Sequence, residues 1–505
     1  MLYDLFLMTG ATLIMRFVGM AFSVYITNKI GAAGMGLYSL VMSVGGFAVT
    51  VALSGVNLAS TRMTAAAIGR GSEREVRGAM RRCILYGIVF GLAAMLGLLL
   101  LAKPISVYLL HDKRCISLLR VLSIGLPFMS LTSALGGYFA AVRRVVKSAI
   151  ASFFEQFVKI AVCVWLIGMI APKGVEYACL AVILGGSISE VASFLLSVAL
   201  YIGDRKKHTF GAKEAIPSLT RKMLDITLPV ALSAYVRSGL LTVEHLLIPI
   251  GLRLYGTSYD AALASYGTLQ GMALPVILFP QALVGALSGL LVPELSERQA
   301  RMEYGSIENT VSRGIQFTLC FSVGAAGTMS CFSQILGQAV YHSSEAGKMI
   351  GMLAPLIPIM YLDHIVDGML KGLGEQLYSM RVNIADAFLS VILVWVLIPR
   401  MGISGYILTI FLMEVLNASL SIMRLLKVCD IKVRFIKWVL KPLASIAAAS
   451  SVVALIMSRV PQDGLSQGIE VTLEMTLVFV LYCMFLRLCR AIDTEDMEWL
   501  KRAVK

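Results

Sequence analysis

The chain has 505 residues, of which 58% are hydrophobic and 15% charged, with a mean hydropathy of +0.82 and a formal net charge of +14. Soluble domains are about 45–50% apolar and about 25% charged, so the composition argues against a soluble enzyme, a nucleic-acid-binding protein and a secreted disulfide scaffold. The excess of Lys and Arg is typical of basic cytoplasmic loops in membrane proteins.

Fourteen stretches are apolar over about 20 residues, the length that a bilayer-crossing helix needs. The eighth contains Pro275 and Pro280 and predicts a kinked helix. The predicted fold is all-α and integral to the membrane. In chain order the predicted spans are 5–27, 35–61, 83–101, 116–140, 149–171, 178–202, 223–250, 261–292, 314–336, 349–370, 378–399, 404–423, 442–457 and 468–486.

The basic residues predict the orientation of these spans. With the N-terminus in the cytoplasm, the inner connections carry 31 of the 44 Lys and Arg residues and the outer connections carry 9. This asymmetry favours an even number of spans, with both chain termini on the cytoplasmic side of the cytoplasmic membrane. The first span carries almost no basic residue before it, so we expect it to be a retained helix and not a cleaved signal peptide.

A weak internal repeat indicates two halves. The end of the second span reads VALSGVNLASTRMTAAA, and the end of the eighth reads ALVGALSGLLVPELSERQA. We therefore predict two pseudo-symmetric six-helix lobes as parallel repeats, followed by two further helices. The predicted domains are an N-lobe (1–202), a cytoplasmic linker (203–222), a C-lobe (223–427) and a C-terminal pair of helices with a cytoplasmic tail (428–505).

Motifs for enzyme chemistry and for metal binding are missing from the sequence. The nine cysteines contain no C-x-x-C pair, and the five histidines have no metal-ligand spacing. No nucleotide-binding or hydrolase motif occurs, and the connections outside the membrane are mostly about 4–14 residues long, too short to hold a catalytic site. We expect no cofactor, and we disfavour a membrane enzyme or scaffold for envelope synthesis.

Charged residues inside the predicted spans are the strongest functional signal, because such charges usually face a cavity or a partner. Arg16 lies near the middle of the first span, and Arg237 and Glu244 lie two turns apart on one face of the seventh. Arginine suits a phosphate or diphosphate because its planar fork makes two hydrogen bonds at once. We predict that these three residues line a central substrate cavity; the alternative is a set of structural ion pairs.

Acidic residues of the tenth to twelfth spans are candidates for an ion, proton or sugar contact. Asp363 and Asp367 lie at i and i+4 on one helix face, where two carboxylates repel each other unless a cation or proton is shared. Asp386 is a further candidate, although it and Glu414 also suit structural roles. The alternative for the aspartate pair is neutralisation by Lys371 or another loop cation.

Several separated segments resemble the stage V sporulation protein B group, in the polysaccharide-flippase branch of the MOP (multidrug/oligosaccharidyl-lipid/polysaccharide) exporter superfamily. The segments are IGAAGMGLYSLVMSV, YGTLQGMALPVILFPQALVGALSGLLVPELSE and LKGLGEQLYSMRVNIADAFLSVILVWVLIPRMGISGY. The resemblance implies an alternating-access transporter that moves an undecaprenyl-diphosphate-linked saccharide, such as the peptidoglycan precursor lipid II, with a role in sporulation. The implied partners are this lipid-linked oligosaccharide, membrane lipids and a coupling cation, and no nucleic acid.

The resemblance also bears on single residues. An R-x-x-G pattern in the first helix of lipid II flippases matches Arg16 to Gly19 here. Two further cavity arginines of those relatives fall near Phe22 and near Leu274 or Pro275, so Arg237 is the expected substitute. The competing hypothesis is a cation-coupled multidrug exporter of the same superfamily, which would place acids and not arginines in its cavity.

Overall fold

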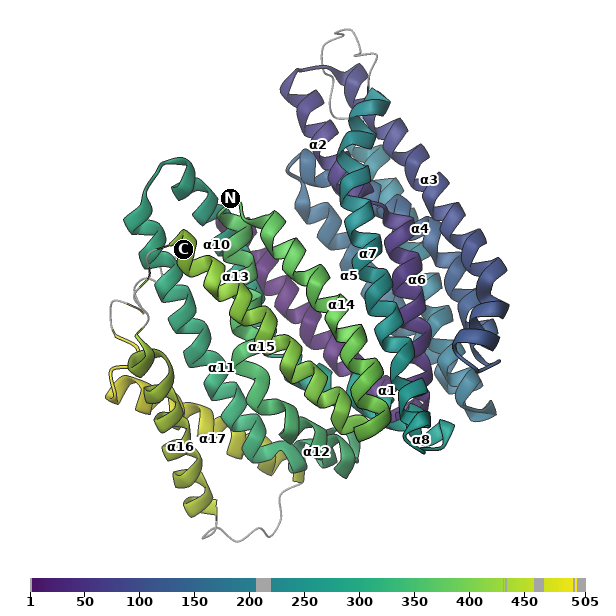
Figure 1. The fold of residues 1–505 in the computed structure, drawn as a ribbon. Helices are drawn as coiled ribbons and strands as arrows, with labels where there is room; N and C mark the ends of the chain where they lie inside the picture. Colours follow the sequence, from purple (N-terminus) through teal and green to yellow (C-terminus); the bar gives the residue numbers. More distant parts are fainter. Residues whose placement is uncertain are drawn as a thin grey trace. The chain divides into compact units, whose positions relative to one another are not determined.

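The computed structural model describes residues 2–205, 219–429, 431, 434–457, 467–493 and 496, and every regular element among them is a helix (Figure 1). The predicted linker 203–222 therefore lies largely outside the described residues. Twelve helical stretches of the described part are long and apolar enough to cross a membrane. One of them, Ile14–Gly69, contains two of the predicted spans, and α17 coincides with the last, so the helices account for all fourteen.

The chain divides into two compact units, which we name by their position in the sequence. The N-terminal unit comprises residues 29–250 and 259–264. Its elements are the second part of α1 (Leu2–Leu53), α2 (Val56–Gly69), α3 (Glu73–Pro104), the π-helical η1 (Ile105–Leu109), α4 (Cys115–Ala141), α5 (Val145–Ile170), η2 (Ala171–Lys173), α6 (Val175–Arg205), most of α7 (Leu219–Leu254) and the start of α8 (Tyr259–Thr268).

The C-terminal unit comprises residues 1–28, 251–258 and 265–505. Its elements are the first part of α1, η3 (Leu269–Ala273), α9 (Leu274–Leu278), α10 (Gln281–Ala300), α11 (Tyr304–Tyr341), α12 (Ser344–Leu353), η4 (Ala354–Leu356), α13 (Ile357–Gly372), α14 (Gln376–Met401), α15 (Ile403–Val428), η5 (Ile436–Leu440), α16 (Lys441–Met457) and α17 (Gln467–Leu488).

These units differ from the predicted lobes in two segments. The first predicted span packs with the C-terminal unit, and α7 packs with the N-terminal unit. Helix α1 passes between the units at Asn28 and Lys29, next to Gly31, where the backbone leaves the helical region with φ of 72° and ψ of 175°. Glycine is suited to this left-handed conformation because it has no Cβ to clash with the backbone. The lobe boundaries at 202 and 223 stay a prediction.

The predicted kink in the span 261–292 is confirmed. The helix is interrupted at Phe279 and Pro280, between α9 and α10, and a π-helical turn precedes it at η3. Proline causes such breaks because it has no N–H to donate and its ring clashes with the preceding turn. In a membrane, an interruption of this kind is tolerated where it is enclosed by protein or lines a cavity.

Glycines allow close helix packing in the N-terminal unit. The sequence contains three Gly-Gly pairs in apolar spans, and in each pair one glycine lies at a contact. A Cβ on Gly45 would lie 2.3 Å from a Leu122 methyl, and one on Gly185 would lie 2.3 Å from the Cys163 sulfur. A Cβ on Gly137 would lie 2.5 Å from the Asn57 carbonyl oxygen. In a bilayer the hydrophobic effect does not drive helices together, and small residues at the contacts let them pack closely instead.

The last two helices are anchored to α11 within the C-terminal unit, where Figure 1 shows α16 and α17 in yellow beside it. Tyr482 of α17 donates a hydrogen bond to the Cys320 carbonyl of α11 from a buried position. Lys437 bonds to Asp493 at 2.7 Å and to Asp496 at 3.3 Å, and Asp496 also accepts from Gln316 of α11 at 2.9 Å. These contacts hold the C-terminal helices on the unit.

We predict that Gly36→Ala destabilises the protein. A Cβ at this position would lie 2.0 Å from the Leu263 carbonyl oxygen, and a backbone atom cannot move aside cheaply. Overpacking of this kind costs about 1–3 kcal/mol, so thermal unfolding in detergent should begin at a clearly lower temperature. Gly46→Ala is the matched control, because Gly46 lies on the same helix with nothing within 4 Å of its Cβ position. Equal midpoints for the two variants would contradict the packing.

Candidate functional site

The guanidinium of Arg16 lies on the first part of α1, where the side chain is exposed. None of the described carboxylates forms an ion pair with it. Its surroundings are Gly285 of α10 and His364 of α13: a Cβ built on Gly285 would lie 4.0 Å from an Arg16 amino nitrogen and 3.4 Å from His364 Nε2. The side-chain nitrogens of Arg16 (α1) and His364 (α13) therefore both lie close to the backbone of α10 at Gly285, which has no side chain.

An aromatic contact stands next to this arginine. Phe17 and Phe279 lie with ring centroids 6.1 Å apart at an interplanar angle of 60°, so α1 contacts the break between α9 and α10. Pro280 follows directly and lines a cavity of about 400 Å³. Arg16 therefore precedes the residue by which α1 contacts the break between α9 and α10.

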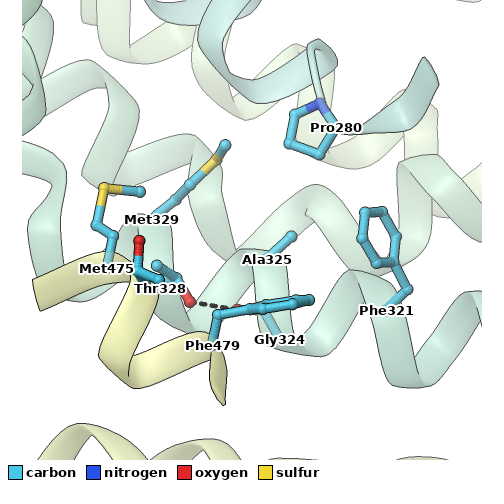
Figure 2. Close-up of a pocket in the computed structure, with 9 residues that line it drawn as sticks. Pro280, Phe321, Gly324, Ala325, Thr328, Met329, Met475 and Phe479 are labelled. Atoms are coloured by element: carbon cyan, nitrogen blue, oxygen red, sulfur yellow. Dashed lines mark hydrogen bonds between the residues drawn. The ribbon is translucent and has the colours of Figure 1, made fainter. Parts of the chain in front are cut away.

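The cavity is almost entirely apolar (Figure 2). Residues of α11 and α17 form its walls opposite Pro280, and Met475 and Phe479 come from α17. The hydroxyl of Thr328 donates to the Gly324 carbonyl at 2.8 Å, so its hydrogen-bonding capacity is used within α11. Such a cavity can hold a hydrocarbon chain or an aromatic group. Its lining residues are Pro280, Phe321, Gly324, Ala325, Thr328, Met329, Met475, Thr476 and Phe479.

Three acids of the C-terminal unit lie close enough to repel one another. The negative charges of Asp363 (α13) and Asp386 (α14) both act on Glu414 (α15), and Asp386 acts on Asp363. Glu414 was expected as a single acid, but the fold brings it to the two aspartates. Like charges at such a site favour a shared proton or a bound cation. Among the described residues, no group of three or more His, Cys, Asp or Glu side chains has the geometry of a metal site.

Asp367 has a different environment from Asp363, although the two lie one turn apart. Its carboxylate pairs with Lys371 at 2.6 Å and accepts a hydrogen bond from the Ser379 hydroxyl of α14. This is the neutralising contact that the sequence left open as the alternative for the pair. Asp367 is thus paired with Lys371, but its charge still acts on Asp363, ahead of that of Asp386, so Asp363 lies between Asp367 and the pair Asp386 and Glu414.

Arg237 and Glu244 belong to the N-terminal unit, on α7. Arg237 is exposed and forms no ion pair with a described residue, whereas Glu244 is buried with 8% of its surface exposed. Neighbouring residues fix this helix against α1, since Thr50 donates to the Ser238 hydroxyl at 3.1 Å. Because Arg16 and Arg237 belong to different units, their joint role in one substrate cavity stays a prediction.

A second group of charges in the N-terminal unit is arranged around Lys159. The lysine acts electrostatically on Glu155 of the same helix and on Glu190 of α6, and the two carboxylates act on each other. Glu155 and Lys159 lie at i and i+4 on α5, whereas Glu190 comes from α6 and is brought to them by helix packing. One lysine therefore lies beside two carboxylates on neighbouring helices, and the two acids can share a proton.

Sequence reasoning missed three features of the site: His364, Gly285 and the apolar cavity. His364 is a lone histidine without metal-ligand spacing, and Gly285 is one of 44 glycines. A signal for His364 was its position inside a predicted span next to Asp363, since ionisable residues are rare there. No sequence signal joins residues of α11 and α17, because helix packing alone forms the cavity wall.

Comparisons with known proteins agree with this fold. The model of a polysaccharide biosynthesis protein family matches residues 1–299, and the MatE model matches residues 254–396. The chain is similar to the stage V sporulation protein B of Bacillus subtilis (strain 168), with 24% identity over 441 residues, which cover 86% of this chain and 85% of that protein.

Two solved structures share the fold. The structure of the lipid II flippase MurJ in its inward closed conformation matches with a TM-score of 0.68 and 13% identity, covering 95% of this chain and 97% of that chain. An inward-facing multidrug resistance MATE family transporter of the MOP superfamily matches with a TM-score of 0.66 and 12% identity, covering 82% and 95%. The chain is therefore a multi-pass membrane protein with the MOP transporter fold, and not an enzyme.

We predict that the positions of Arg16 and Arg237 face water and not lipid. An unpaired guanidinium in hydrocarbon is costly, so both side chains need a hydrated surrounding. Arg16→Cys and Arg237→Cys should each react with a membrane-impermeant, water-soluble thiol reagent in proteoliposomes, in a background from which the exposed native cysteines have been removed. These cysteines are Cys331, Cys483 and Cys489.

Leu100→Cys is the lipid-facing control for this labelling, because Leu100 is an apolar residue of α3 that is 77% exposed. It should label slowly or not at all, since thiolate formation needs water. Labelling of the two arginine positions at the rate of Leu100→Cys would place them against lipid and exclude them from a substrate path.

Proposed function

We propose, since the chain belongs to the polysaccharide biosynthesis protein family, that it flips an undecaprenyl-diphosphate-linked saccharide across the cytoplasmic membrane by alternating access. The cargo that fits best is a peptidoglycan precursor such as lipid II. Two relatives support this choice, since one bears the name of a sporulation protein and the other that of a lipid II flippase. The basic inner connections support a cytoplasmic position for both termini.

The observation that carries the proposal is the exposed guanidinium of Arg16, which has no acid partner among the described residues and lies near Gly285. The same unit also holds an apolar cavity at Pro280. A lipid-linked diphosphate has an anionic group that suits the arginine and a long hydrocarbon chain that suits the apolar cavity. Arginine binds the phosphate by two parallel hydrogen bonds and keeps its charge at any depth. The cavity of about 400 Å³ beside Pro280 offers a place for the first isoprene units.

The acids of the C-terminal unit provide a coupling site in this proposal. Asp363, Asp386 and Glu414 repel one another, so binding of a monovalent cation or a proton would relieve the repulsion. A site of this kind gives the transport cycle a driving force that does not depend on nucleotide hydrolysis. Asp367 adds to the repulsion at Asp363, but it has its own partner in Lys371.

The second candidate function is a cation-coupled multidrug exporter of the same superfamily. The MatE match to residues 254–396 favours it, as does the same cluster of acids. A cavity for cationic drugs would however expose acids and not an unpaired arginine. Deletion of the gene distinguishes the two functions. Loss of a drug exporter would lower the minimal inhibitory concentration of cationic drugs, whereas loss of a flippase would impair envelope polysaccharide synthesis.

We predict that Arg16→Ala strongly slows transport of the lipid-linked precursor. Purified protein in liposomes with a defined undecaprenyl-diphosphate saccharide would be assayed for access to the head group from each side. A hydrogen bond to a charged group is worth about 1.5–3 kcal/mol, so loss of the Arg16 guanidinium should slow transport about ten- to a hundredfold. Insertion should be normal, because no described acid loses a partner.

Arg301→Ala is the matched control, since it removes an arginine whose ion pair with Glu297 is 63% exposed on both sides. It should flip the precursor at the wild-type rate. Full activity of Arg16→Ala in the same vesicles would remove this arginine from the mechanism.

We predict that filling the apolar cavity also slows transport. Ala325→Trp places a bulky ring in the space that the hydrocarbon chain would take, and head-group binding through Arg16 is left intact. Transport of the long-chain lipid should fall severalfold, whereas binding of inorganic diphosphate should not change. Leu100→Trp, at an exposed site on α3, controls for the added ring. Equal transport by the two Trp variants would show that the cavity takes no part.

A further inference from the structure

We propose that His364 and the bare backbone at Gly285 complete a phosphate subsite with Arg16. This inference deepens the proposed function and rests on it, since it names the residues that would hold the anionic group of the lipid cargo. All three residues belong to the C-terminal unit, on α13, α10 and α1.

The packing of α10 against α13 sets the position of His364. A Cβ on Gly368 would lie 1.9 Å from the Ser288 hydroxyl oxygen, and a Cβ on Gly372 would lie 2.9 Å from the Val292 carbonyl oxygen. These two glycines follow His364 at intervals of four residues, so they lie on the same face of α13. Their partners follow Gly285 along α10 in the same order. The two helices therefore run parallel in close contact, in a register that brings His364 to Gly285.

The space above Gly285 is bounded by two nitrogen donors and no other side chain. A Cβ at this position would lie 3.4 Å from His364 Nε2 and 4.0 Å from an Arg16 amino nitrogen, and nothing else lies within 4 Å. A phosphate oxygen can approach closer than a methyl group, because a hydrogen bond of about 2.7–3.2 Å is shorter than a van der Waals contact. The missing side chain of Gly285 thus leaves room for an acceptor between the donors.

The charges around this space favour an anion. The positive charge of Arg16 acts on His364, and both side chains are exposed. The negative charge of Asp367 also acts on His364, but this carboxylate is paired with Lys371 and accepts a hydrogen bond from the Ser379 hydroxyl. Two positive charges, Arg16 and Lys371, thus act on His364 against one acid, and a phosphate has enough acceptor oxygens to bind both Arg16 and His364. An imidazole can donate from Nε2 whether it is neutral or charged.

The experiment uses the purified full-length protein in detergent, with farnesyl diphosphate as a short isoprenoid diphosphate and farnesol as the same chain without phosphate. Isothermal titration calorimetry measures both dissociation constants. His364→Leu should weaken farnesyl diphosphate binding about tenfold, the effect of one charge-assisted hydrogen bond, and should leave farnesol binding unchanged. His364→Gln retains a donor and should restore part of the affinity.

Gly285→Ala provides an independent variant that should fold normally. Its methyl group would make ordinary contacts, and alanine stabilises a helix relative to glycine. The methyl nevertheless occupies the space between the donors, so farnesyl diphosphate should bind about tenfold more weakly while the melting temperature stays or rises. Gly289→Ala is the matched control, one turn further along α10 with nothing within 4 Å of its Cβ position, and should bind as the wild type does.

The outcomes separate this subsite from the proposed function. Wild-type affinity in both His364→Leu and Gly285→Ala, together with a loss in Arg16→Ala, would overturn the role of His364 and leave the flippase proposal standing. Equal affinity of the wild-type protein for farnesol and farnesyl diphosphate would overturn both, since no anion site would then exist.

Discussion

The proposed site depends on one arginine without a described acid partner, Arg16, in the otherwise apolar first predicted span. Placing a charge at the centre of a membrane span costs about 2.5–3.5 kcal/mol even on insertion scales, and the described part of the chain offers Arg16 no acid to offset it. The helix therefore needs water or an anion at this point. Packing of α10 and α13 through small residues provides a place for one, because Gly285 has no side chain to cover the guanidinium.

In the C-terminal unit, charged and ionisable residues of α13 lie on different faces of the helix. His364 and Asp363 are neighbours in sequence on α13, yet they point to different partners: the histidine lies by Arg16 and the aspartate lies by Asp386 and Glu414. Consecutive residues of a helix are about 100° apart around its axis, so one helix can serve an anion on one side and a cation or proton on another. The same helix can then connect the occupancy of the two sites.

The apolar cavity extends this arrangement along the same unit. Its walls combine the interruption at Pro280 with α11 and α17, so the helices beyond the first twelve spans contribute to the site and do not merely follow the repeats. The same unit thus holds an arginine without a described acid partner, a group of acids and an apolar cavity. The proposed lipid-linked cargo uses the first and the last of these.

The sequence by itself determined the membrane environment, the number of spans and the break near Pro275 and Pro280, because these follow from hydropathy and proline geometry, which are local. It also singled out Arg16 as a candidate, from the cost of a charge inside a span. It did not determine that the first span packs with the C-terminal unit, that Asp367 pairs with Lys371 while Asp363 joins Glu414, or that His364 meets Arg16. Only the tertiary structure decided these pairings, because each depends on which faces of separate helices meet. That choice is made by close packing at residues such as Gly285 and Gly368, whose spacing resembles that of many other glycines in the chain.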